Sequence, residues 1–250
     1  MIFTIAWREC RGLFLSPLAW SILGVTQLIL GYLFLSQLET FVLLQPRLAA
    51  LDGAPGLTDL VIAPLFANAA MVCLLVIPLM TMRLVAGERR NGTLPLLYSA
   101  PLSASEIVLG KYLGIVLFLL VLVALILLMP LSLLMGGSLD PGKLASGLLG
   151  MFLLLASFAA IGLFMSTLTG QPVVAAVATF GVLLGLWIVD WAGNHGETAD
   201  DLLRYLSALR HYESLLQGLV RSEDLVYFAL LIATFLILGI RRLDAERRRG

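Results

Sequence analysis

One stretch of this sequence comes within a single residue of a phosphate-binding loop. Residues 137–144 read GSLDPGKL, but the motif requires Ser or Thr after its lysine to hold Mg²⁺, and this chain has Leu144 there. The stretch also lies between two long apolar runs, whereas the motif connects a strand to a helix. We therefore interpret it as a turn rich in Gly and Pro, and we expect no ATP hydrolysis by this chain.

Other residue types that carry chemistry are few and far apart. His195 and His211 lack the close pairing of a zinc protease, and both lie outside the apolar runs in which a membrane haem would find its ligands. We interpret His211 as a polar residue at the membrane interface rather than as a ligand or a pH sensor. Cys10 and Cys73 have no metal or redox spacing and are interpreted as packing residues. We expect no metal site, no cofactor and no catalytic residue in this chain.

The long apolar runs carry no ionisable residue near their centres. Carriers driven by protons or ions keep such residues at mid-membrane, because their cost is tolerated only for function. Here the candidates lie at the ends of the runs, where side chains can extend toward water: Arg83, Lys111, Asp190 and Asp224. The pattern favours an amphiphilic or apolar substrate, or mechanical coupling, over a secondary transporter.

The main polar interruption in the first half of the chain is residues 83–114, RLVAGERRNGTLPLLYSAPLSASEIVLGKYLG. Its inner part, residues 92–99, is predicted to form a short helix with a leucine face and with Pro95 in the first turn. The Ala100-Pro101 pair predicts an extended link. Residues 103–106 form a capping box directly before an apolar run, so a long helix begins there. A short helix between two membrane helices is suited to docking onto a soluble partner.

The same stretch carries an ordered set of residues: Glu88, Gly92-Thr93-Leu94, Leu97, Pro101 and Gly110-Lys111. This set resembles the segment between the second and third spans of ABC-2 type transporter permeases, where a coupling helix engages an ATP-binding subunit. The resemblance implies that two copies of a separate ABC ATPase bind ATP and Mg²⁺. It also implies that the ATPase contacts this chain at Glu88, Arg89, Arg90, Gly92, Thr93, Leu94, Leu97 and Pro101.

Composition indicates a membrane protein. Of the 250 residues, 60% are hydrophobic and 13% are charged, with a mean hydropathy of +1.00, whereas globular domains are about 45–50% apolar and about 25% charged. The net charge of zero gives no reason to expect a nucleic-acid partner. We predict an all-α polytopic membrane protein without a cleavable signal peptide, in which residues 37–59 form a polar loop. Its single domain, residues 1–250, has six spans at about 17–36, 60–82, 107–130, 144–168, 172–191 and 224–240.

The distribution of Lys and Arg predicts the orientation of these spans. With six spans, 11 of the 16 basic residues fall on the side that holds both termini and residues 86–106, the predicted coupling segment. Basic residues accumulate on the cytoplasmic side of a membrane. We therefore expect both termini to be cytoplasmic, in the inner membrane of a bacterium.

Two further segments are predicted to be amphipathic helices. Residues 1–15 place Trp7 and Cys10 on one side and Arg8 on the other, as in the elbow helix with which ABC-2 permeases begin. The alternative is a frayed extension of the first span. Residues 200–221 repeat leucines at helical spacing, which indicates an external helix against or dipping into the outer leaflet. The alternative is a soluble helix that covers the bundle.

The end of the chain carries a second resemblance. The run Leu206-Ser207, His211-Tyr212, Gly218, Val220, Asp224 and Tyr227-Phe228 is similar to the segment before the last span in the gliding-motility branch of ABC-2 permeases. The copper-enzyme maturation permeases of the nitrous-oxide reductase system are similar there too. Together the two resemblances cover most of the chain.

Small residues mark the expected helix contacts. Gly147, Gly150 and Ser157 in the fourth span, and Gly181 with Gly185 in the fifth, permit close approach of two backbones. The Gly181 and Gly185 pair could lie at a dimer seam or inside one bundle.

Two function classes remain after these considerations. In the first, the chain is the permease of an ATP-driven exporter and pairs with a second permease, the same chain or a sister chain, in the bilayer. In the second, it is a six-span scaffold whose external segment assembles a periplasmic partner without transport. No residue supports a third class, an intramembrane enzyme.

Overall fold

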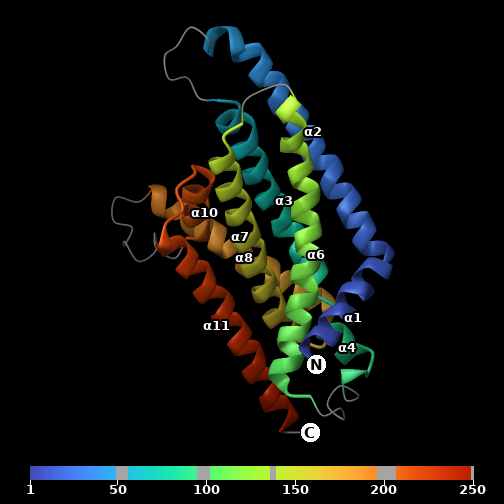
Figure 1. Ribbon diagram of the computed structural model, residues 1–250. Coiled ribbons are helices and arrows are strands. Elements are labelled where there is room, and N and C mark those ends of the chain that lie inside the picture. The colour runs from blue at the N-terminus through green and yellow to red at the C-terminus, as the bar shows by residue number, and fades with distance from the viewer. Residues whose placement is uncertain (49–55, 95–101, 136–138, 196–206, 249–250) are drawn as a thin grey trace.

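The computed structural model describes residues 1–48, 56–94, 102–135, 139–195 and 207–248 (Figure 1). Every regular element within these ranges is helical, which confirms the all-α prediction. In chain order the elements are α1 (Ile2–Leu15), α2 (Pro17–Leu48), the π-helix η1 (Thr58–Ile62), α3 (Ala63–Thr81), α4 (Ala86–Arg90), α6 (Ala104–Ser132), the 3-10 turn η2 (Leu133–Met135), α7 (Pro141–Leu168), α8 (Pro172–His195), α10 (Ala208–Leu216) and α11 (Ser222–Arg247).

Five of the helical segments are long and apolar enough to cross a membrane. They are Pro17–Arg47, Thr58–Arg90, Ala104–Ser132, Pro141–Leu168 and Ser222–Arg247. In α8 the apolar stretch within the described residues, Pro172–Ile188, is shorter. The chain is therefore a multi-pass membrane protein, and a sixth crossing by α8 stays a prediction.

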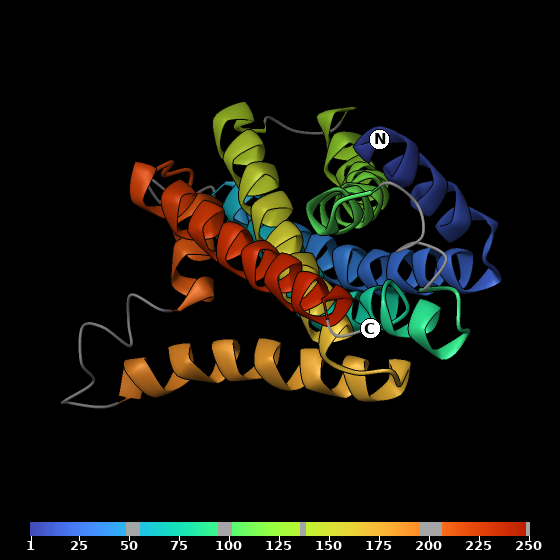
Figure 2. The same ribbon diagram turned by 90° about the horizontal axis from the view of Figure 1, so that it is seen from below.

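Helix α7 lies at the centre of the bundle and contacts α3, α6, α8, α10 and α11. In its most apolar 18-residue window 67% of the residues are buried, against 28% in α2 and 28% in α11. Figure 1 accordingly shows α2 and α11 at the margins. Seen from below, α8 runs along one margin and α1 lies with α6 near the opposite one (Figure 2).

Glycines set how closely α7 approaches its neighbours. A Cβ atom on Gly162 would lie 2.2 Å from the hydroxyl oxygen of Thr81 in α3, and one on Gly147 would lie 2.9 Å from the Phe66 ring. On Gly150 it would lie 2.8 Å from Leu215 Cβ in α10. The prediction that Gly147 and Gly150 mark helix contacts is confirmed, and those contacts lie inside one bundle.

The predicted beginning of the third long helix is confirmed. The Ser103 hydroxyl accepts a hydrogen bond from the Glu106 amide, and the Glu106 carboxylate accepts one from the Ser103 amide. This reciprocal pair satisfies amide groups that have no partner within the first turn of a helix. Local sequence therefore determines where α6 starts.

The prediction of a polar loop over residues 37–59 is wrong in its first part. Helix α2 continues to Leu48, because residues 37–45 contain neither Gly nor Pro and Pro46 comes only in the last turn. The last helix is also longer than its predicted span, since α11 continues past residue 240 to Arg247. In both helices the polar residues mark where the apolar run ends, but the helix itself continues through them.

The contact between Gly162 and Thr81 gives a test of this packing. Gly162→Ala should lower the free energy of unfolding by about 1–3 kcal/mol, because the added methyl group has no space and both helices must shift. Denaturant unfolding of the purified protein in detergent measures the change. Gly24→Ala in α2 is the matched control, since nothing lies within 4 Å of the added carbon. Equal stability of the two variants would contradict the described helix contact.

Candidate functional site

The first helix is seated directly on α6 through two glycines. A Cβ on Gly110 would lie 2.7 Å from Ile5 Cβ, and one on Gly114 would lie 2.7 Å from Glu9 Cβ. This approach buries Ile5, Ala6 and Cys10, and burial raises the pKa of the Cys10 thiol. The thiol is therefore neutral and packs as an apolar group, as predicted.

Helix α1 is not an extension of the first span. The two helices are separated at Ser16, whose backbone is extended, and the Trp20 indole donates a 2.8 Å hydrogen bond back to the Phe14 carbonyl. Phe3 and Trp7 on α1 remain exposed, at 84% and 68%. The helix thus has one side on the bundle and another with aromatic residues available to lipid, which is the arrangement expected of an interfacial helix.

Lys111 joins three elements at this junction. Its ammonium group donates to Glu9 in α1 at 2.9 Å and to Glu88 in α4 at 2.7 Å. The Lys111 side chain is only 1% exposed, whereas those of Glu9 and Glu88 are 17% and 19% exposed. The prediction that Lys111 extends toward water is therefore wrong: the residue lies about 10 Å along α6 from its first residue, and it finds carboxylates there instead of solvent.

A second cation lies on the outer side of this cluster. The Arg8 guanidinium is 3.1 Å from Glu9 and 3.8 Å from Glu88, and its side chain is 58% exposed. One oxygen of Glu88, Oε2, is buried and has no hydrogen-bond partner among the described residues. The cluster of Arg8, Glu9, Glu88 and Lys111, called here the junction cluster, thus balances two cations against two carboxylates.

The interruption of the helix between α3 and α4 is stabilised by hydrogen bonds to a residue near the end of α7. The Ser166 hydroxyl accepts hydrogen bonds from the amides of Val85 at 3.1 Å and Ala86 at 3.0 Å. It donates to the Met82 carbonyl at 3.2 Å. These are amide and carbonyl groups that the interruption of the helix leaves without helical partners, so the break is a defined turn.

Arg89 connects α4 with two further helices. Its guanidinium donates to the Thr167 carbonyl at the end of α7 at 3.1 Å and pairs with Glu246 in α11. Arg247, next in α11, donates to the Leu102 carbonyl before α6. Helix α4 is therefore bound to α7 and α11 on one side and to α1 and α6 through the junction cluster.

The predicted start of the coupling helix at residue 92 is wrong. Gly92 has φ +69° and ends α4: its amide bonds to the Arg89 carbonyl, and the Thr93 amide bonds to that of Glu88. This pair of bonds is a Schellman motif, which favours Gly because the left-handed region carries no penalty without a Cβ. Leu94 is helical again and buried. Residues 95–101, including Leu97 and Pro101, lie outside the described residues.

The residues predicted to contact an ATPase point in two directions. Glu88 and Arg89 face the rest of the chain, and Leu94 is buried. Arg90, Gly92 and Thr93 are exposed. The segment Arg90–Thr93, called here the exposed tip, projects from a base that is held by ion pairs.

Sequence reasoning missed the partners of these residues. Glu9, Ser166 and Glu246 were not singled out, although Glu9 is the acidic residue within the otherwise apolar and basic α1. Gly110 and Gly114, on either side of Lys111, could have indicated that another helix packs against α6 at Lys111, because small residues four positions apart permit two helices to approach closely.

The segment predicted to be external packs against the bundle through α10 (Ala208–Leu216). Helix α10 contacts α7, α8 and α11, and it buries Tyr212 and Leu215. The Tyr212 hydroxyl donates to the Phe66 carbonyl at 2.9 Å, and Ser146 donates to the Leu215 carbonyl at 2.7 Å. Burial raises the pKa of Tyr212, so its phenol stays neutral. Residues 200–206 of the predicted helix lie outside the described residues.

His211 and Asp224 are buried together at this end. A ring nitrogen of His211 and a carboxylate oxygen of Asp224 are 2.6 Å apart, and the imidazole stacks on Tyr227. The prediction of an interfacial His211 is therefore wrong, because its α10 face is covered by α11. The stretch that resembles a phosphate-binding loop also has a structural role. Asp140 caps the start of α7, and the Lys143 ammonium group donates to the Asp59 carboxylate at 2.7 Å.

The sequence matches a known transporter family over nearly all of the helices described above. A family model described as ABC-2 family transporter protein matches residues 4–247. The chain belongs to the ABC-2 family. The match begins in α1 and ends in the last residues of α11, so it includes the junction cluster, the exposed tip and α10. A search of curated proteins found no match.

Membership in the ABC-2 transporter family makes the chain a membrane permease component. Such a component is not itself catalytic, and it normally works with an ABC ATPase. The resemblance that residues 83–114 carry is confirmed at the level of the family. The match does not distinguish the branches of that family.

In this ABC-2 transporter protein, Lys111→Met should lower the free energy of unfolding by about 3–5 kcal/mol, because Glu9 and Glu88 would remain partly buried without their shared cation. Thermal and denaturant unfolding in detergent measure the effect. Lys143→Met is the matched control: its pair with Asp59 is about one-third exposed and should be worth about 0–1 kcal/mol. Similar losses in both variants would show that Lys111 does not hold the junction.

Proposed function

We propose that this chain is the permease subunit of an ATP-driven ABC exporter, in which ATP hydrolysis by a separate subunit moves a substrate across the bacterial inner membrane. The observation that carries the proposal is the exposed tip on its fixed base. Arg90, Gly92 and Thr93 are free to meet a partner, while Glu88 and Arg89 just before them are tied into the helix bundle.

The proposed mechanism is mechanical. Displacement of the tip is passed by Glu88 to α1 and α6 through Lys111, and by Arg89 to α7 and α11. A nucleotide can drive such a change only if its binding subunit contacts the permease differently in two states. Glu88 and Arg89, the base of the exposed tip, are suited to this role because their ion pairs keep α4 bonded to the neighbouring helices when it moves in either direction. An exposed loop without such bonds would move without displacing those helices.

The partner set follows from the same proposal. Two copies of an ABC ATPase bind ATP and Mg²⁺ and act on two permease chains, either two copies of this chain or this chain and a sister chain. The face of α8 that carries Gly181 and Gly185 supports a contact between the permeases. Nothing lies within 4 Å of a Cβ on either glycine, and Val177 and Leu184 nearby are exposed. Close approach of a second helix would use that open face.

Orientation belongs to the proposal as well. The end at which α1, α4 and both termini lie carries most of the basic residues (Figure 1), which favours a cytoplasmic location for it. We place the chain in the gliding-motility and nitrous-oxide-reductase-maturation branch. The residues of that resemblance support the assignment, since His211, Asp224, Tyr227 and Phe228 form one cluster between α10 and α11.

A scaffold role is less well supported. It would use the external segment as its working surface, yet the apolar side of α10 is already covered by the bundle. The buried bonds of Tyr212 and Ser146 make that helix part of the fold.

Co-purification with the proposed ABC ATPase subunit tests the proposal. The wild-type chain should retain the ATPase, and Arg90→Glu should weaken retention by about tenfold or more, because charge reversal at a contact costs several kcal/mol. Arg47→Glu is the matched control, since Arg47 is also exposed but lies near the far end of α2. Failure of the wild-type chain to retain the ATPase, or equal retention by both variants, would contradict the proposal.

The permease pair has a separate test. Gly181→Leu should reduce co-purification of two differently tagged permease chains by about tenfold without lowering the unfolding midpoint, because no atom of the described residues lies within 4 Å of the added Cβ. Gly24→Leu, at another open position, should leave the pair intact. If Gly181→Leu has no effect on pairing, the α8 face is not the seam.

A further inference from the structure

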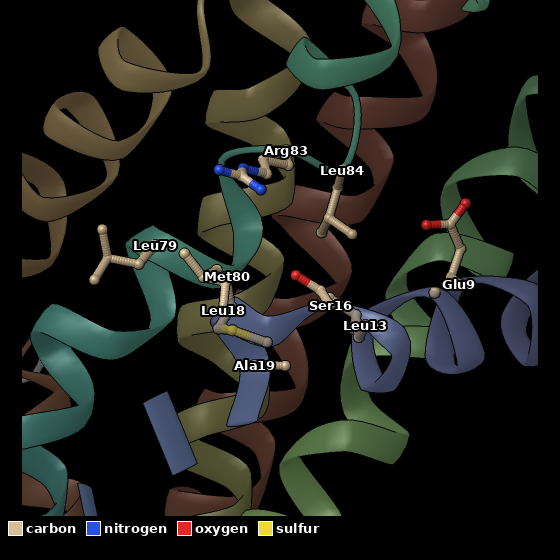
Figure 3. Close-up of a pocket in the computed structure, with 10 residues that line it drawn as sticks. Glu9, Leu13, Ser16, Leu18, Ala19, Leu79, Met80, Arg83 and Leu84 are labelled. Carbon is tan, nitrogen blue, oxygen red and sulfur yellow. The ribbon is translucent and has the colours of Figure 1, made fainter. Parts of the chain in front are cut away.

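A small hollow lies where α1, α2 and the end of α3 meet (Figure 3). It has a volume of about 210 Å³. Leu13 from α1, Leu18 and Ala19 from α2, and Leu79 and Met80 from α3 give it apolar walls. Because ligand pockets for whole small molecules measure about 300–1,000 Å³, this hollow fits a head group or part of a chain, not an entire large ligand.

Two polar groups of the hollow have no partner. Arg83 and Ser16 both line it, and within the described part of the chain neither the Arg83 guanidinium nor the Ser16 hydroxyl makes a hydrogen bond or ion pair. Glu9 is the other charged residue of the lining, but its carboxylate is engaged by Lys111 and Arg8. The hollow therefore offers an unopposed cation and a hydroxyl above apolar walls.

Two exposed tryptophans indicate that the hollow lies near the level of the lipid head groups. Exposed Trp7 and Trp20 lie on the two helices that border it, and tryptophan accumulates at the level of the lipid head groups. Gly12 lines this hollow and also a second one, which Arg8 and Arg11 line. Basic residues thus line both hollows that border α1.

We propose that the hollow between α1, α2 and the end of α3 binds an anionic phospholipid, with Arg83 and Ser16 holding its phosphate and the apolar walls holding the start of an acyl chain. An anionic lipid satisfies both features at once: a basic pocket between membrane helices attracts its head group, and the leucines remove the chain from water. The lipid would sit beside the α1–α2 link and next to the break that precedes α4. The inference needs only that the chain lies in a membrane, and it does not depend on coupling to an ATPase.

Native mass spectrometry of the purified full chain tests the site, with phosphatidylglycerol and phosphatidylcholine of identical acyl chains as probes. The wild type should retain one phosphatidylglycerol in preference to phosphatidylcholine. Arg83→Gln should lose that preference, with retention lower by about tenfold or more, because a hydrogen bond to a charged group is removed. Gly12→Leu should reduce retention of phosphatidylglycerol by filling the hollow that Gly12 lines, since no protein atom lies within 4 Å of the added Cβ.

Matched variants separate the site from general effects. Arg242→Gln removes an exposed cation elsewhere, and Gly24→Leu adds the same side chain at another open position, so both should retain phosphatidylglycerol like the wild type. An unchanged unfolding midpoint for Arg83→Gln and Gly12→Leu shows that they fold. Equal retention of the two lipids by the wild type, or full retention by Arg83→Gln, would overturn the proposal. Displacement of the lipid by millimolar inorganic phosphate would also overturn it, in favour of a soluble anion.

Discussion

The fold of the α1 end depends on one buried ammonium group. Lys111 has almost no exposed side chain, and its charge is balanced by Glu9 and Glu88 from two other elements. A charge in such a place costs several kcal/mol unless it is paired. This cost is what makes the junction specific: α1 must lie on α6, and α4 must lie against both, for the three charges to be satisfied. Gly110 and Gly114 permit it by removing the side chains that would keep α1 away.

The same requirement explains why the second long span is interrupted. The Ser166 hydroxyl makes the interruption after Thr81 possible, because it accepts hydrogen bonds from the Val85 and Ala86 amides, which have no helical partners there. The turn reorients α4, so that Glu88 points to Lys111 and Arg89 to Glu246. Two residues that are adjacent in sequence thus connect opposite sides of the bundle. The polar residues of the segment serve the fold first, and the exposed tip after them remains available to a partner.

Local signals in the sequence predicted the helices well and the site only partly. The apolar runs, the capping box at Ser103 and the glycines of α7 depend on neighbours within a few residues or on a general rule for close packing, so they were predictable. The partner of Lys111 was not, because Glu9 lies 102 residues away and no pattern on either helix specifies the pair. Gly92 was misread for a different reason: an Asn-Gly pair can begin a turn or end a helix, and the five-residue α4 is too short to show periodicity. His211 was misplaced because its surroundings come from α11.

The two ends of the bundle are held by different interactions, and the difference bears on how the molecule can move. At the α1 end, ion pairs bind α4 to α1, α6 and α11, a hydrogen bond from Arg89 binds it to α7, and its base has little freedom. At the other end α10 is held by hydrogen bonds from Tyr212 and Ser146 and by the close contact at Gly150. Helix α8 contacts α3, α4, α7 and α10, and among the described residues nothing lies within 4 Å of a Cβ added at Gly181 or Gly185. Because packed interfaces shift between discrete arrangements rather than deform continuously, a push on α4 should displace its bonded helices together and change their packing against α8. Relative motion is therefore expected where these bonded helices contact α8.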